Sequence, residues 1–117
     1  MKSSRYEYLF RNLKKQNAKA CVISSTRGVP IAWFGLEKKK IDIFSALSAT
    51  VYGASSALHK EAGLSSPDTA LSYSEKSFLL IKPMHDGTVL AVLGSGDHEK
   101  LSKKVDKAIE ESGGVAL

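Results

Sequence analysis

The chain has 117 residues, of which 43% are apolar and 25% are charged, and its formal net charge at pH 7 is +5. This length allows one hydrophobic core and excludes two, so we expect a single domain over residues 1–117. No apolar run reaches the roughly 18 residues of a membrane span, and no apolar stretch follows the basic N-terminus, so we expect neither a span nor a secretory signal. The single cysteine, Cys21, excludes an internal disulfide and predicts a cytoplasmic protein.

The positive charge is concentrated in the first third of the chain. Residues 1–40 contain ten lysines and arginines and two acidic residues, whereas residues 41–117 contain seven lysines and ten acidic residues. A solvated helix face and a loop explain this distribution, and the alternative is attraction to an acidic protein surface, nucleic acid or anionic lipid.

The predicted elements begin with a helix over residues 4–16, for which Asn17 is the expected stop. Its inward stripe consists of Tyr6, Leu9, Phe10 and Leu13. Two strands are predicted next, at residues 19–25 and 30–35, and Gly28 supplies the positive φ that the tight turn between them needs.

The second of these strands is predicted to lie at the edge of a sheet, since Pro30 cannot donate to a strand ladder unless it is the first residue. Trp33 and Phe34 are adjacent, so they point to opposite faces, and both are buried only if helices cover both faces. A tryptophan on an edge strand is also well placed to contact a partner. The candidate partner-docking residues are Arg27, Trp33, Lys38, Lys39 and Lys40.

Residues 40–61 form the most informative predicted element, a helix that is apolar on two sides and has almost no charge. Bulky residues recur at spacings of three and four, which predicts that they pack on the core; they are Phe44, Leu47, Val51, Ala54 and Leu58. The other side carries the small residues Ala46, Ala49, Thr50, Gly53 and Ala57. One small domain has no second core to cover this side, so we expect a second copy of the helix to pack against it. Such a close approach would offset the cost of about 1 kcal/mol that mid-helix glycine carries relative to alanine.

Three further strands are predicted at residues 69–74, 77–83 and 88–94, with a hairpin turn at His85-Asp86-Gly87. The last helix is predicted over residues 97–112, with Asp97 as its cap and Gly113-Gly114 as its end. Hairpins dominate these connections. The order therefore predicts an antiparallel sheet with the long helix on one face and the two terminal helices on the other.

Motifs for catalysis or cofactor binding are missing from the sequence. The three histidines lack paired metal-ligand spacing, and one cysteine cannot complete a site. Gly94-Ser95-Gly96 begins like a dinucleotide-binding fingerprint, but Glu99 stands where the third glycine would be. No phosphate-binding loop and no nucleophile with a base is recognisable. We therefore expect no metal, no cofactor and no enzyme activity.

Three stretches of the chain resemble the roadblock family, which includes dynein light-chain type domains. They are Ala20-Cys-Val-Ile-Ser-Ser-Thr-Arg-Gly-Val-Pro-Ile-Ala, the Ala/Ser/Gly-rich helix 40–61, and Phe78-Leu-Leu-Ile-Lys-Pro-Met-His-Asp-Gly-Thr-Val-Leu-Ala-Val-Leu. The resemblance covers about residues 5–112. At the first turn Thr26-Arg27-Gly28 replaces the acidic-Gly pair of relatives, which changes the charge at the hairpin tip.

The resemblance implies an α/β sandwich of the roadblock/longin type, with a five-stranded antiparallel sheet in the order 2-1-5-4-3. It also implies a homodimer, or a heterodimer with a paralogue, in which the third strand pairs with its copy and the long helix packs on its copy. In matching positions the interface residues are Ala46, Ala49, Thr50, Gly53, Ser56, Ala57, Thr69, Leu71 and Tyr73. The implied function is that of a non-enzymatic regulator or scaffold that binds a Ras-like small GTPase and adjusts its nucleotide cycle or location.

Two other functional classes stay open from the sequence. A small-molecule sensor of PAS, GAF or profilin-like shape has similar size and layering, but it needs a pocket with converging polar groups. A basic adaptor could bind nucleic acid or an anionic membrane through residues 1–40. Nucleic acid is not expected as the main partner, since the aromatic residues of the first helix mostly share its buried stripe.

Overall fold

The computed structural model of the protein describes residues 6–111. In chain order, its helices and strands are α1 (Glu7–Lys15), β1 (Ala20–Ser24), β2 (Pro30–Phe34), a 3-10 turn η2 (Lys38–Lys40), α2 (Ile41–Glu61), β3 (Ala70–Tyr73), β4 (Phe78–Pro83), β5 (Val89–Gly94) and α3 (His98–Glu111). Every predicted helix and strand is present. The predicted helix start at residue 4 and the predicted stop at Gly113-Gly114 lie outside the described residues.

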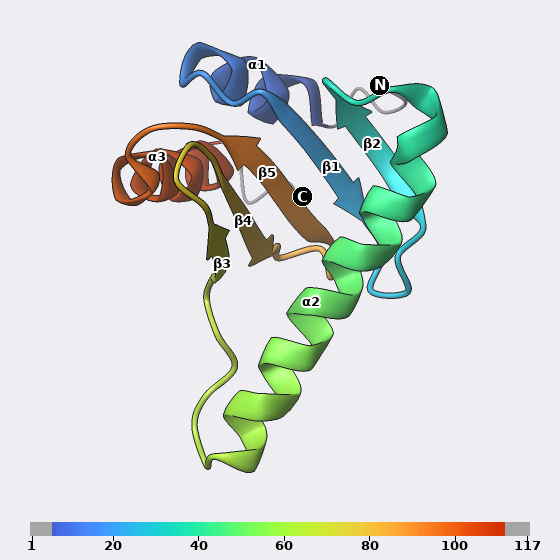
Figure 1. Ribbon diagram of the computed structural model, residues 1–117, viewed down its shortest axis with the longest axis vertical. Helices are drawn as coiled ribbons and strands as arrows, with labels where there is room; N and C mark the ends of the chain where they lie inside the picture. Colours follow the sequence, from blue (N-terminus) through green and yellow to red (C-terminus); the bar gives the residue numbers. More distant parts are fainter. Residues whose placement is uncertain (1–5, 112–117) are drawn as a thin grey trace.

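The five strands form one antiparallel sheet in the order β2-β1-β5-β4-β3, as predicted (Figure 1). Three hairpins, β1–β2, β3–β4 and β4–β5, join the strands that are consecutive in sequence. The pairing of β1 with β5 brings together strands from the two halves of the chain, with Val22 opposite Ala91. The two open edges are β2 and β3, and Pro30 begins β2 as the sequence suggested.

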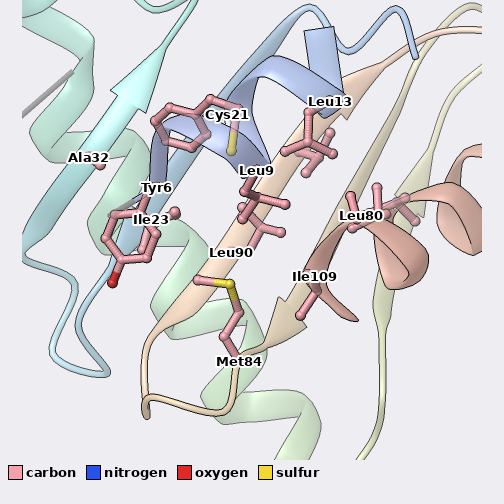
Figure 2. Close-up of a cluster of buried hydrophobic side chains, with 14 of the residues drawn as sticks. Tyr6, Leu9, Leu13, Cys21, Ile23, Ala32, Leu80, Met84, Leu90 and Ile109 are labelled. Atoms are coloured by element: carbon pink, nitrogen blue, oxygen red, sulfur yellow. The ribbon is translucent and has the colours of Figure 1, made fainter. Parts of the chain in front are cut away.

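Helices cover both faces of the sheet. α1 and α3 lie on one face and close the larger core, in which Leu9 and Leu13 of α1 meet Ile23, Leu80 and Leu90 of the sheet (Figure 2). α2 lies on the other face, where a smaller cluster contains Val22, Ala70, Ile81, Val89 and Ala91. The predicted arrangement of one long helix opposite two terminal helices is therefore confirmed.

Polar contacts connect the helices of the larger core to the sheet. The Tyr6 hydroxyl donates a hydrogen bond of 2.7 Å to Asp86 Oδ2, across 80 residues of sequence. The same carboxylate accepts hydrogen bonds from the backbone N–H and the side-chain hydroxyl of Thr88, which holds the β4–β5 turn in shape. The start of α1 is thus tied to the end of the central hairpin.

Gly28 is the residue that allows the β1–β2 turn to lie close to α2. Its φ is +87°, and a Cβ atom at this position would stand 2.8 Å from the Ala46 Cα. Gly87, in the other hairpin, has a similar φ of +82°, but a Cβ atom there would have no neighbouring atom within 4 Å. Substitutions at these two glycines therefore distinguish the cost of backbone strain, which both positions share, from the cost of a steric conflict, which only Gly28 has.

We expect Gly28→Ala to lower the free energy of unfolding by about 1 kcal/mol or more beyond Gly87→Ala, because only the first adds a steric conflict to the left-handed strain of about 1–2 kcal/mol. Urea unfolding of both variants measures the difference. Equal losses in the two variants would show that the contact between the turn and α2 is not tight.

Candidate interaction surface

The sheet-facing side of α2 is not the side that the sequence predicted. The buried residues of the helix are Ile41, Ser45, Ser48 and Ala49, and Phe44 and Tyr52 are half-buried. The prediction that Leu47, Val51, Ala54 and Leu58 pack on the core is wrong, since all four are exposed. Of the predicted stripe, only Phe44 reaches the core.

The outward side of α2, which we call the outer face, is apolar along most of the helix. Its bulky residues are Ile43 (56% exposed), Leu47 (57%), Val51 (43%) and Leu58 (71%). The small residues Ala46, Thr50, Gly53, Ala54 and Ala57 are exposed beside them. At Gly53, no atom lies within 4 Å of where a Cβ would stand. Bulky and small residues thus form one surface, which the part of the chain that the structure describes leaves uncovered.

Half of α2 extends past the sheet. Figure 1 shows its C-terminal half running beyond the ends of the strands, with the following segment returning to β3. The Tyr52 hydroxyl donates to the Pro67 carbonyl oxygen at 3.1 Å, and His59 Nδ1 lies 3.1 Å from the Ser65 carbonyl oxygen. These contacts hold the returning segment against one side of the helix and leave the outer face open.

By length and composition, the segment Lys38–Glu61 could cross a membrane, but such helices also occur in the cores of soluble proteins. Only 22% of its most apolar window is buried in the chain itself. Its inner side packs on the sheet, so the feature that remains to be explained is the exposed outer face.

The second part of the surface is the open edge of β3. The Ser74 N–H donates to the Ser77 carbonyl oxygen at 2.8 Å, and in this register Leu71 faces Leu80 and Tyr73 faces Phe78. Since hydrogen-bonded and non-hydrogen-bonded pairs alternate along an antiparallel ladder, the N–H and C=O groups of Leu71 and Tyr73 point away from β4. Both side chains are exposed, and the Tyr73 ring stacks on His98 with centroids 5.0 Å apart. The edge is therefore able to pair with another strand.

The predicted interface residues divide by exposure into an exposed, a half-buried and a buried group. Ala46, Thr50, Gly53 and Ala57 lie on the outer face, and Leu71 and Tyr73 lie on the open edge of β3. Ser56 and Thr69 are half-buried. Ala49 is 8% exposed and packs toward the sheet, so its place on an outward contact surface is corrected.

The predicted docking residues do not form one cluster. Arg27 is exposed in the turn before β2, whereas the exposed residues Lys38, Lys39 and Lys40 follow the other end of that strand. Trp33 is half-buried against the smaller core, so its ring is mainly structural. Lys39 Nζ lies 3.8 Å from Glu37 Oε2 in an exposed pair that contributes little to stability.

A buried lysine that the sequence analysis did not identify lies on the opposite face of the sheet. The Lys82 side chain is 3% exposed, and its Nζ donates to Thr69 Oγ1 at 2.6 Å and lies 3.0 Å from Asp106 Oδ1. A hollow of about 560 Å³ adjoins it, with carboxylates of Asp68, Asp106 and Glu110 on its wall. The only signal in the sequence was a charged residue inside the apolar run of β4.

Lys82 links α3 to the sheet edge. We expect Asp106→Asn to lower the free energy of unfolding by about 1–3 kcal/mol, since it leaves a buried ammonium with one fewer partner. In the Lys82→Met background the same substitution should cost almost nothing. Urea unfolding of the two single variants and the double variant gives the coupling free energy. An equal cost of Asp106→Asn in both backgrounds would contradict the link.

The described residues offer little for catalysis. Between Tyr6 and Glu111, no three His, Cys, Asp or Glu side chains come close enough together to hold a metal ion. Burial raises the pKa of the Cys21 thiol well above its ordinary value, which keeps it protonated and unreactive.

Comparison with known proteins identifies the fold. The sequence matches the family model described as Roadblock/LC7 domain over residues 6–94. A search of curated protein sequences gave no match.

Solved structures of the same architecture superpose on most of the chain. A Roadblock/LC7 domain from Streptomyces avermitilis is 19% identical, with a TM-score of 0.78 over 90% of this chain and 92% of that one. MglB from Myxococcus xanthus is 17% identical, with a TM-score of 0.77 over 97% and 89%. The gliding protein MglB from Thermus thermophilus is 17% identical, with a TM-score of 0.76 over 99% and 91%. At these identities the likeness establishes the fold.

Proposed function

Because the chain belongs to the Roadblock/LC7 domain family, we propose that it is a dimeric, non-enzymatic module of the cytoplasm that binds a Ras-like small GTPase and adjusts its nucleotide cycle or location. The protein acts as one domain over residues 1–117, without a cofactor. Its dimer consists of two identical copies, with a paralogue as the other possible partner.

The single observation that carries this proposal is the uncovered outer face of α2. Full burial of a Leu, Ile or Val side chain is worth about 1.5–3 kcal/mol relative to exposure, and four such residues lie along this face. A second α2 helix is a suitable cover, since Ala46, Gly53 and Ala57 allow the two backbones to approach closely while the bulky residues interdigitate. Stable dimers of this kind bury on the order of 800 Å² per subunit.

The edge of β3 supports the same assembly. An open strand edge is a liability that proteins cover by pairing, and this edge has no proline and no charged residue. Pairing of β3 with its copy joins two sheets into one, with the two α2 helices on the same face. The two α2 helices would then lie beside one another and pack together on that face.

The regulatory effect on the GTPase comes from positioning. No activated nucleophile is found among residues 6–111, so any change in the rate of GTP hydrolysis arises from groups of the partner that docking holds in place. Exposed cations at Arg27 and at Lys38–Lys40 flank β2 and provide contacts to an acidic partner surface.

We expect Gly53→Leu to weaken dimerisation by a few kcal/mol, because the single chain has room for the side chain but a closely packed second helix does not. Leu47→Asp should weaken it by a similar amount, since the carboxylate would lose its hydration in the interface. Analytical ultracentrifugation at low micromolar concentration measures both effects. Tyr8→Asp on α1, an exposed aromatic away from both surfaces, is the control. A wild-type chain that is monomeric and soluble at this concentration would refute the proposed dimer.

The regulatory role is tested with Ras-like GTPases encoded in the same genome. We expect the wild-type protein to bind one of them and to change its rate of GTP hydrolysis or nucleotide release, and we expect Gly53→Leu to reduce the effect in proportion to the loss of dimer. Single-turnover hydrolysis and fluorescent-nucleotide release give the rates. Absence of binding to every such GTPase would refute the partner class while leaving the dimer intact.

A further inference from the structure

The groove between α1 and α3 carries a row of lysines that form no ion pair with the described residues, and we propose that it binds an acidic helix of a partner protein. This groove lies on the face of the sheet opposite α2. It therefore stays open when the outer face of α2 is covered, and the proposal goes beyond the function proposed above.

Two adjoining hollows mark the groove. Their volumes are about 170 and 270 Å³, and both are lined by Gln16 of the segment after α1 and by Lys104 of α3. Asn12 and Asn17 line one hollow each, and the Asn12 Nδ2 donates one hydrogen bond of 3.0 Å to the Tyr8 carbonyl oxygen. Amides and ammonium groups together can donate several hydrogen bonds to carboxylates.

The lysines of the groove are Lys100, Lys104 and Lys107, at spacings of four and three along α3. Like charges at these spacings face one another and destabilise a helix by a few tenths of a kcal/mol per pair. Within residues 6–111, no carboxylate lies within ion-pair distance of any of the three, although Lys104 is half-buried. An anionic ligand would relieve this repulsion.

Two carboxylates lie at the ends of the groove and leave its centre positive. Asp97 accepts a hydrogen bond of 3.1 Å from the Lys100 backbone N–H and so caps the start of α3. Glu111 lines the smaller hollow at the last turn of the helix. A partner that fits must therefore place its negative charges between these two positions.

A helix suits this spacing better than other acidic ligands. With a rise of 1.5 Å per residue, the three lysines are separated along the axis by about 6 and 4.5 Å, and glutamates at spacings of four and three on a facing helix have the same separations. A helix packed on α3 would lie at an axial distance of about 8–10 Å, with side-chain ridges of one helix in the grooves of the other. Single-stranded nucleic acid would need aromatic rings for stacking, and no aromatic residue lines either hollow.

The experiment uses two helical peptides of the same composition and the full-length protein. One peptide has three glutamates on a single face at spacings of four and three, and the other has them distributed around the helix. We expect the first to bind about tenfold more tightly, by isothermal titration calorimetry, and to weaken as the salt concentration rises from about 50 to about 500 mM. No saturable binding up to about 1 mM peptide, or equal affinity for both peptides, would overturn the proposal.

Charge reversal locates the binding site. We expect Lys104→Glu to weaken binding about tenfold. Lys107→Glu leaves the half-buried Lys104 intact and should weaken binding by a similar factor. The matched control is Lys39→Glu, which changes the net charge equally but lies in a second lysine cluster before α2. Equal loss in this control would place the peptide elsewhere. A polyuridine strand and phosphatidylserine vesicles are tested in the same way. If either binds more tightly than the acidic peptide, and Lys104→Glu weakens that binding, the proposal is overturned in favour of that ligand.

Discussion

The packing of α2 on the sheet determines the rest of this structure. The inner side of the helix carries small residues, chiefly Ser45, Ser48 and Ala49, while the sheet beneath supplies the bulk through Val22, Ile81 and Val89. Small residues on the helix let it lie close to the strands, and Gly28 extends this contact to the β1–β2 turn. Ile41, Phe44 and Tyr52 share this inner side, while the bulky residues Ile43, Leu47, Val51 and Leu58 of the same helix are left outside. The exposed apolar surface is therefore a direct result of how α2 packs on the sheet.

The elements themselves could be predicted from the sequence, because local signals mark both their type and their ends. Gly28 and Gly87 define hairpin turns, Pro30 begins an edge strand, and Asn17 adopts a positive φ of 67° where the first helix was expected to end. The order of strands was implied by the family resemblance and is confirmed. The residues alone predict an antiparallel sheet with helices on both faces, but not the order of its strands.

The face of α2 could not be predicted, because hydrophobic periodicity assumes that the more apolar side points inward. Here the helix is apolar nearly all round, so hydrophobicity alone does not select the inner side. The Ser45 hydroxyl is buried and makes no hydrogen bond with the described residues, which is consistent with a position chosen for its small volume. The buried position of Lys82 and its partners could not be predicted either. Its charge interrupts an apolar run by one residue, and only the fold reveals that Thr69 and Asp106 stand beside it.

The two faces of the sheet differ in how fully the described residues cover their apolar side chains. On the side of α1 and α3, large residues such as Leu9, Leu13 and Val105 are fully buried, and the Tyr6–Asp86 and Lys82–Asp106 contacts fix both helices to the strands. That side is closed by the chain itself, so its remaining surface is polar and carries the lysine groove. The α2 side is closed only in part and is apolar where it is open. An apolar surface favours a permanent partner, whose removal would expose it to water, whereas exposed charges favour partners that come and go with little cost. The division between a closed polar face and an open apolar face thus supports the proposed assembly through α2 and β3, and the proposed exchangeable contacts on the other side of the same sheet.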